Sequence, residues 1–213
     1  MENVYIELVR LIPSLLWFVL TVVIFSLFYK PIRHELLPKL TGFSFKGVKF
    51  SFLEKSIDAA IIELAQKNPK WDVAVPAEAR EAAVNRAKKN LSLFEGAQIL
   101  WVDDEPGAFQ NERNMFVRLK TQITVALNTE EAVEKLARGR YDFIISDMAR
   151  GADPAAGLTL LMRLQQNKDR TPVIFYIGIF DPAKGVPPLA FGITNRPDEL
   201  LHLALDVLER TKN

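Results

Sequence analysis

Two stretches of the sequence decide the fold: ILWVDDEP at residues 99–106 and FIISDM at residues 143–148. In each stretch, an apolar run long enough for one strand ends in acidic residues. Asp103 and Asp104 follow the first run, and Asp147 follows the second. Short, continuous apolar runs with polar ends are typical of strands buried on both faces of a sheet. Both stretches therefore predict central strands of a parallel sheet.

Predicted strands and helices alternate around these two stretches. We expect strands at residues 99–102, 123–127, 141–146, 173–177 and 190–194, and helices at 106–119, 130–137, 158–166 and 198–209. This alternation predicts an α/β domain at residues 96–213. Its sheet would be doubly wound, parallel and five-stranded, with helices covering both faces.

The three aspartates should lie close together in such a fold. Asp103, Asp104 and Asp147 all stand at the carboxyl ends of strands, where open α/β sheets bind their ligands. Because the first and third strands are expected to be neighbours, the three carboxylates would share one pocket. A cation would offset their charge, and carboxylate oxygens favour Mg²⁺. One carboxylate could also act as a nucleophile toward a phosphoryl group. The alternative is that all three are only polar residues at strand ends.

WVDDEP at residues 101–106 and IISDM at residues 144–148 resemble the motifs of the response-regulator receiver domain, which has a flavodoxin-like fold. The resemblance covers just over half of the chain. It implies that Asp147 is the phosphoacceptor and that Asp103 and Asp104 bind Mg²⁺ together with it. It also implies bacterial phosphorelay signalling, with a histidine kinase or a phosphotransfer protein as partner.

The sequence departs from the receiver pattern around the fourth and fifth strands. Receivers carry Thr or Ser at the position of Ile177, and the isoleucine side chain cannot donate a hydrogen bond to a phosphoryl oxygen. Receivers carry Lys before a proline at this point, whereas this sequence has Arg196 before Pro197. The Arg196 guanidinium could contact a phosphoryl group through its fork of donors. Residues 178–189 contain three prolines, so the usual fourth helix should be shortened or missing. We expect a preserved metal pocket with an altered switch.

An uncharged segment, LIPSLLWFVLTVVIFSLFY at residues 11–29, predicts a transmembrane helix within the N-terminal segment 1–30. Its 19 residues would rise about 28 Å, close to the ~30 Å of a hydrocarbon core. A cleaved signal peptide fits poorly, because Glu2 and Glu7 precede the apolar run and no small-residue cleavage site follows it. A buried core helix is disfavoured by the length and by apolar residues on all sides.

Cations after this segment predict its orientation. Lys30, Arg33 and Lys39 follow it, whereas only Arg10 precedes it. The positive-inside rule then gives a single-pass protein of the cell inner membrane, with the N-terminus outside and the C-terminal domain cytoplasmic. Residues 30–94 hold 12 Lys or Arg against 7 Asp or Glu. This excess of positive charge either attracts anionic lipid headgroups or is only a solvated basic surface.

Residues 31–95 are predicted to form a small α+β neck module. Residues 41–52 alternate phenylalanine or valine with polar residues around Gly47, which indicates a hairpin or a bulged strand pair. Apolar spacing predicts a helix at residues 53–67. A short extended piece should follow, and Pro76 should open a second helix.

Together these features predict a membrane-anchored, receiver-like signalling protein that is phosphorylated on Asp147 with Mg²⁺. We expect no enzyme activity and no nucleic-acid partner, whereas the membrane helix and the neck could form homo-oligomers. The chain has no cysteine, which excludes disulfides and thiolate metal sites.

Two alternatives from other classes stay open. The first is a degenerate receiver used as an oligomerisation or ligand-sensing scaffold in a membrane stress or antiphage effector. The second is a phosphatase with an aspartate nucleophile and Mg²⁺, although the sequence shows no motif for a separate general acid.

Overall fold

Five parallel strands form one sheet in the computed structural model, which describes residues 16–18, 20, 37–67, 70, 74–105, 107–181, 183 and 185–212. The strand order is β2-β1-β3-β4-β5. The strands are β1 Gln98–Val102, β2 Gln122–Ala126, β3 Phe143–Ser146, β4 Val173–Tyr176 and β5 Gly192–Thr194. The predicted five-stranded parallel α/β sheet is therefore confirmed, with small differences at the strand ends.

The most apolar strands occupy the middle of the sheet. All residues of β3 and β4 are buried, and so are those of β1 after Gln98. Strand β2 lies at one edge and is only partly buried. Parallel strands covered on both faces read as continuous apolar runs, which is the signal that predicted β1 and β3.

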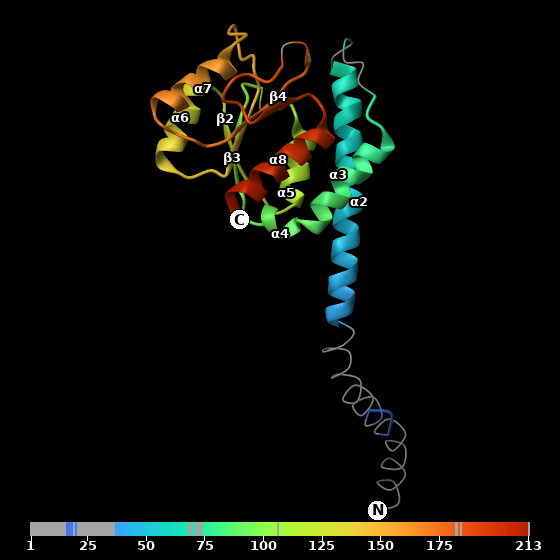
Figure 1. Cartoon of the computed structure of the whole chain (residues 1–213). Coiled ribbons are helices and arrows are strands. Elements are labelled where there is room, and N and C mark those ends of the chain that lie inside the picture. The colour runs from blue at the N-terminus through green and yellow to red at the C-terminus, as the bar shows by residue number, and fades with distance from the viewer. Residues whose placement is uncertain are drawn as a thin grey trace, which may run out of the picture. The chain divides into compact units, whose positions relative to one another are not determined.

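Helices cover both faces of the sheet (Figure 1). They are α5 Gln110–Arg118, α6 Thr129–Arg138, α7 Ala156–Gln166 and α8 Pro197–Lys212. Successive side chains of β1 enter two different cores, as the alternation along a strand requires. Leu100 and Val102 join the core that contains Leu160 of α7, whereas Trp101 joins the core that contains Phe116 of α5. Helices α6 and α7 thus cover one face, and α5 and α8 cover the other.

The connection from β4 to β5 contains no α-helix among its described residues, which exclude 182 and 184. The expectation of a shortened or missing fourth helix is confirmed for this part of the chain. Pro187 and Pro188 explain it, because proline lacks the backbone N–H donor and restricts the residue before it.

Among the described residues from 37 onward, helices α2 Leu37–Lys67, α3 Ala77–Lys89 and α4 Leu91–Phe94 precede the sheet. The chain divides into two compact units, Met1–Val48 and Lys49–Asn213. Residues 49–95 therefore belong to the same unit as the sheet, although the sequence suggested a boundary at 95/96. Their buried apolar side chains join the core on the α5 and α8 face; they include Leu53, Ile57, Leu64, Val84 and Phe94. Within this unit, these helices add a further layer to that face.

The predicted hairpin at residues 41–52 is wrong, because α2 runs through the whole segment as one helix. Buried side chains along α2 recur every three or four residues: Phe50, Leu53, Ile57, Ala60 and Leu64. This is the period of a helix, and it extends across the end of the predicted hairpin. Since helix growth is cooperative, the local alternation of phenylalanines did not decide the structure. The described neck is helical rather than α+β, while Trp71 and Val73 of the expected extended piece lie outside the described residues.

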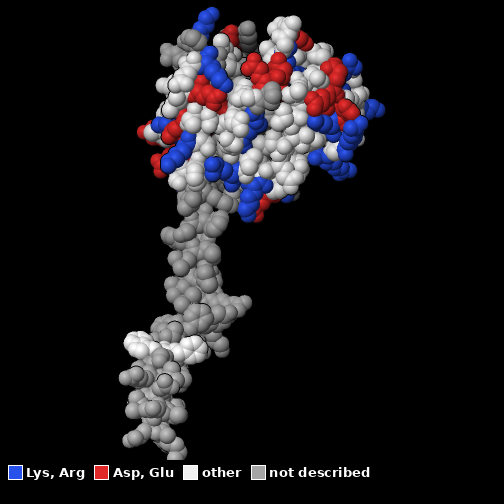
Figure 2. All heavy atoms as spheres, turned by 180° about the vertical axis from the view of Figure 1, so that it is seen from behind, with Lys and Arg blue, Asp and Glu red and all other residues white. Residues whose placement is uncertain are grey.

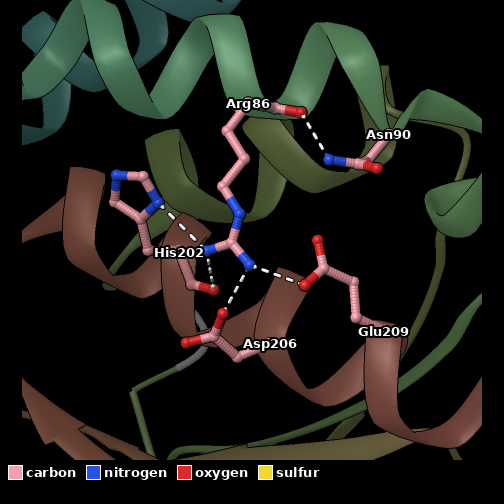
Figure 3. Close-up of polar contacts among 5 residues, drawn as sticks. All are labelled: Arg86, Asn90, His202, Asp206 and Glu209. Carbon is pink, nitrogen blue, oxygen red and sulfur yellow. Dashed lines mark hydrogen bonds and ion pairs between the residues drawn. The ribbon is translucent and has the colours of Figure 1, made fainter.

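Ion pairs connect α3 to α8 (Figure 3). The Arg86 guanidinium donates to Asp206 at 2.5 Å and to Glu209 at 2.9 Å. Its Nη1 also lies 3.4 Å from Nδ1 of His202. Burial and the neighbouring guanidinium lower the pKa of His202, so its imidazole is held neutral at pH 7. A neck helix is thereby fixed to the last helix of the sheet domain.

The predicted transmembrane segment at residues 11–29 lies outside the described residues, except for 16–18 and 20. Among the residues that are described, no helix combines the length and the apolar character needed to cross a bilayer.

Candidate functional site

The carboxyl ends of β1 and β3 bring two of the predicted aspartates to one edge of the sheet. Val102 of β1 is in register with Ser146 of β3, so Asp103 and Asp147 are the next residues on neighbouring strands. Figure 2 shows Asp and Glu side chains gathered toward this end of the second unit. The site therefore begins with two carboxylates held at the ends of two buried, paired strands.

Asp103 is the more deeply buried of the two, with 2% of its surface exposed. Its Oδ1 accepts a hydrogen bond from the backbone N–H of Glu105 at 2.9 Å, whereas its Oδ2 is buried and has no hydrogen-bond partner. Burial raises the pKa of Asp103, against smaller opposing effects of the Glu105 backbone N–H and the Arg113 guanidinium. A buried carboxylate oxygen without a partner is costly, and a bound cation is one way to satisfy it.

Asp147 is the predicted phosphoacceptor, and it is partly exposed. Its Oδ1 accepts a hydrogen bond from the backbone N–H of Met148 at 2.6 Å. Burial, together with the nearby charge of Asp103, raises the pKa of Asp147 to about 6. The carboxylate is therefore mostly ionised at neutral pH, and its charge is poorly compensated.

Asp104 is placed differently from the other two. It is exposed, and its Oδ2 accepts a hydrogen bond from the backbone N–H of Gly151 at 2.7 Å. Across the described part of the chain, no three His, Cys, Asp or Glu side chains are grouped so that they could hold a metal ion. The predicted ligand set of Asp103, Asp104 and Asp147 is thus not assembled as a triad. Asp104 instead holds the loop that follows β3.

The residues present nevertheless fit Mg²⁺. This ion commonly takes one or two carboxylates from the protein and keeps several waters. Binding would satisfy the buried Oδ2 of Asp103 and offset the charge that raises the pKa of Asp147. Asp103 and Asp147 are therefore the side chains that would hold it.

A cavity of about 340 Å³, the acidic cavity, lies beside these aspartates. Its described walls come from the end of α2, the β1–α5 loop, α5, the β3–α7 loop and Gly178. The charged wall residues are Glu63, Lys67, Asp103, Asp104, Glu105, Glu112 and Asp147. Two of these, Glu63 and Lys67, come from the neck, and no motif in the sequence marked them.

Glu112 of α5 is a buried acid in the wall of the acidic cavity, and its exposed fraction is 2%. The Tyr176 hydroxyl donates to its Oε1 at 2.7 Å, while its Oε2 is buried with no partner. Burial raises the pKa of Glu112, which favours the protonated form. The wall of the acidic cavity is thereby linked to the end of β4.

Ile177 and Arg196 do not line the acidic cavity. Arg196 donates through Nε and Nη2 to Asp198, at 3.2 and 2.5 Å, and Asp198 is only 1% exposed. The Arg196 guanidinium, which was predicted to contact a phosphoryl group, is instead paired with the buried carboxylate of Asp198. Ile177 lines a second cavity of about 670 Å³, together with Ile179 and Asp147.

Arg150 is a cation near the site that the sequence analysis missed. Its guanidinium is buried and donates to Ser146 Oγ and the backbone oxygen of Asp147, both at 2.7 Å. It also donates to Thr129 Oγ1 at 2.9 Å and to the backbone oxygen of Ala156 at 2.8 Å. Arg150 thus fixes the backbone around Asp147. Only the folded structure reveals this role, since Arg150 lies in the β3–α7 loop while Thr129 and Ala156 belong to α6 and α7.

Comparison with protein families supports a receiver domain in this part of the chain. Residues 99–183 match the family described as the response regulator receiver domain. The matched segment contains all three predicted aspartates and Ile177, and it ends before Arg196. No curated protein matches the sequence.

Several solved structures of receivers are similar to the chain. The chemotaxis response regulator CheY4 of Vibrio cholerae shares 22% identity at a TM-score of 0.46, over 53% of this chain and 98% of that chain. Response regulator TrrA of Thermotoga maritima, described in complex with Mg²⁺ and BeF, shares 23% at 0.46, over 52% and 98%. The receiver domain of an HD domain-containing protein of Pseudomonas fluorescens shares 26% at 0.47, over 55% and 97%.

Proposed function

We propose that this protein accepts a phosphoryl group on Asp147 and works in phosphorelay signalling. The observation that carries the proposal is the pairing of Asp147 with Asp103 at the end of two central strands. One of the two has an unsatisfied buried oxygen, and both face a cavity of about 340 Å³. The receiver match over residues 99–183 supports the same chemistry.

The reaction needs few groups from the protein. A carboxylate oxygen of Asp147 attacks the phosphorus of the donor, and the bond from phosphorus to the leaving group breaks, which gives an acyl phosphate. With acetyl phosphate as donor, acetate leaves. Arg150 keeps the Asp147 backbone in place through its 2.7 Å hydrogen bond. Mg²⁺ held by Asp103 and Asp147 would supply positive charge for the phosphoryl oxygens.

Acetyl phosphate provides a direct test. The full chain in detergent is incubated with acetyl phosphate and Mg²⁺, and its intact mass is measured beside that of Asp147→Asn. We expect one phosphoryl group on the wild type, and none on the variant or in the presence of EDTA. A wild type that gains nothing, or a variant that gains as much, would contradict the proposal.

We further propose that the protein is anchored in the inner membrane, with the domain of residues 96–213 in the cytoplasm. The support is the uncharged run at residues 11–29 and the cations that follow it. A histidine kinase or phosphotransfer protein would then supply the phosphoryl group. Removal of residues 1–30 should release the protein from the membrane fraction, whereas the full chain should resist alkaline extraction. Recovery of the full chain in the soluble fraction would contradict the anchor.

A second candidate function is a ligand-sensing or oligomerisation scaffold that does not use phosphorylation. The specific support is Ile177 and the cavity of about 670 Å³ that it lines together with Phe180. A scaffold predicts that Asp147→Asn behaves as the wild type in cells. It also predicts the same oligomeric state with and without acetyl phosphate, whereas a phosphorylation-driven protein should change in at least one of these measurements.

A further inference from the structure

The end of α2 forms part of the wall of the acidic cavity, although it lies outside the receiver motifs. Glu63, Leu64 and Lys67 line the cavity. Leu64 is 3% exposed and belongs to the core shared with α5 and α8, so it anchors this turn of the helix. Glu63 and Lys67 are one helical turn apart and therefore share a face.

Lys67 is the one cation among the described residues that line the acidic cavity. A phosphoryl group on Asp147 would add further negative charge beside Asp103, and it needs charged donors for its oxygens. Arg196 is held by the buried Asp198. Arg150 is engaged with backbone and hydroxyl oxygens. Lys67 is left as the cation in the cavity wall that can serve this purpose.

The present contact of Lys67 is easy to exchange. Its Nζ lies 2.5 Å from Oε1 of Glu63, but the two side chains are 53% and 27% exposed. Ion pairs of this kind contribute little to stability, because water competes for both partners. The flexible four-carbon stem of lysine allows the ammonium to turn to a new anion.

If Lys67 leaves Glu63 for a new anion, the contact between α2 and α5 should change. Glu63 accepts a second hydrogen bond, from Nδ2 of Asn111 to Oε2 at 2.7 Å. The next residue, Glu112, is the buried acid that accepts from Tyr176. When the Lys67 ammonium moves away, Glu63 loses its counter-charge while it remains near the acid Glu112. The end of α2 would therefore have to readjust against α5.

We propose that Lys67 is the cationic contact for a phosphoryl group on Asp147, and that α2 senses occupancy of the acidic cavity through it. This inference rests on the proposed phosphorylation of Asp147. It assigns the contact to a helix that precedes the receiver match, in place of Arg196 near β5.

Beryllium trifluoride, an analogue of the phosphoryl group, provides the test. The full chain in detergent with Mg²⁺ is titrated with beryllium trifluoride, and bound fluoride is followed by ¹⁹F NMR. We compare Lys67→Met, Lys67→Arg and the matched control Lys55→Met, which removes an exposed lysine of α2 that does not line the cavity. We expect about 10-fold weaker binding for Lys67→Met, because one charge-assisted contact is lost. Lys67→Arg should recover most of the affinity, and Lys55→Met should match the wild type.

Mg²⁺ affinity without fluoride separates this role from a structural one. Lys67→Met should bind Mg²⁺ as tightly as the wild type or more tightly, since an ammonium repels the ion. Equal fluoride affinity in Lys67→Met and Lys55→Met would overturn the inference, and so would a parallel loss of Mg²⁺ affinity. If the wild type still takes up phosphate from acetyl phosphate in that case, only the role of Lys67 fails. A wild type that binds neither probe would overturn the proposed function as well.

Discussion

At the ends of β1 and β3, Asp103 and Asp147 lie side by side and face the acidic cavity. At the ends of β4 and β5, Ile177 and Arg196 lie outside the acidic cavity. Ile177 lines the cavity of about 670 Å³, which Asp147 also lines. Arg196 is held by the buried Asp198. In the first pair, Oδ2 of Asp103 is buried without a hydrogen-bond partner and the pKa of Asp147 is raised. In the second pair, Ile177 has no polar group and the Arg196 guanidinium is already paired with Asp198.

The two carboxylates of the proposed phosphorylation site thus have incompletely compensated charge, whereas Arg196, which was predicted to contact the phosphoryl group, is already paired within the protein. The acidic cavity borders on α2, whose apolar side chains from Phe50 onward share a core with the sheet domain. The neck is therefore a better candidate than the β4–β5 region for the element that responds to a phosphoryl group.

The largest effect should come from the acidic side, with Asp103→Asn. Loss of this carboxylate should lower Mg²⁺ affinity by about 100-fold, since even residues that only support a metal ligand cost 10- to 100-fold. Isothermal titration of the full chain with Mg²⁺ measures this effect. Asp104→Asn is the matched control and should lose much less, because Asp104 is exposed and holds Gly151. Equal losses for the two variants would contradict the assignment of Asp103.

At the ends of β4 and β5, which we call the switch side, Arg196→Met should reduce the stability of the fold rather than its affinity for anions. It leaves Asp198, which is 1% exposed, without its guanidinium, and this should cost about 1–3 kcal/mol because the pair is only partly buried. Chemical denaturation measures the loss, and beryllium trifluoride affinity should stay at the wild-type value. A stable variant with weakened fluoride binding would restore Arg196 as the phosphoryl contact.

Asp147→Asn should stabilise the metal-free protein in a pH-dependent way. The pKa of Asp147 is raised to about 6 when folded, so ionisation costs the wild type stability as pH rises from about 4 to 6. The variant avoids this cost. It should be more stable by about 1–2 kcal/mol above pH 6, a figure that allows for solvent screening, and nearly equal to the wild type below pH 4. Denaturation in EDTA at several pH values tests this, and a less stable variant at pH 7.5 would contradict it.

The smallest effect should come from Ile177→Thr, which places a hydroxyl at the usual switch position. Ile177 packs against the core of α6 and α7, so its loss should cost about 1 kcal/mol of stability. Phosphorylation by acetyl phosphate should be unchanged, because Ile177 lines the second cavity beside Asp147 and not the acidic cavity, where Asp103 and Lys67 lie. A clear gain in the lifetime of the acyl phosphate would show that the switch side still takes part.

The sheet and the aspartates could be predicted because their signals are local. Buried parallel strands are continuous apolar runs, and the acidic residues follow them directly in the chain. The hairpin prediction failed because Phe43 and Phe45 alternate locally. The helix predicted at residues 53–67 instead begins at Leu37, and the packed core shows that its buried face already includes Phe50. Lys67 could not be found in this way, since its place in the cavity depends on how α2 packs.

Hydrogen exchange of the full chain tests the comparison most directly, measured with and without beryllium trifluoride and Mg²⁺. Amides at residues 60–67, at the end of α2, should change their protection when the anion binds. Amides in β5 and in the turn around Arg196 should change little. Altered exchange in β5 with no change at the end of α2 would contradict the proposed role of α2.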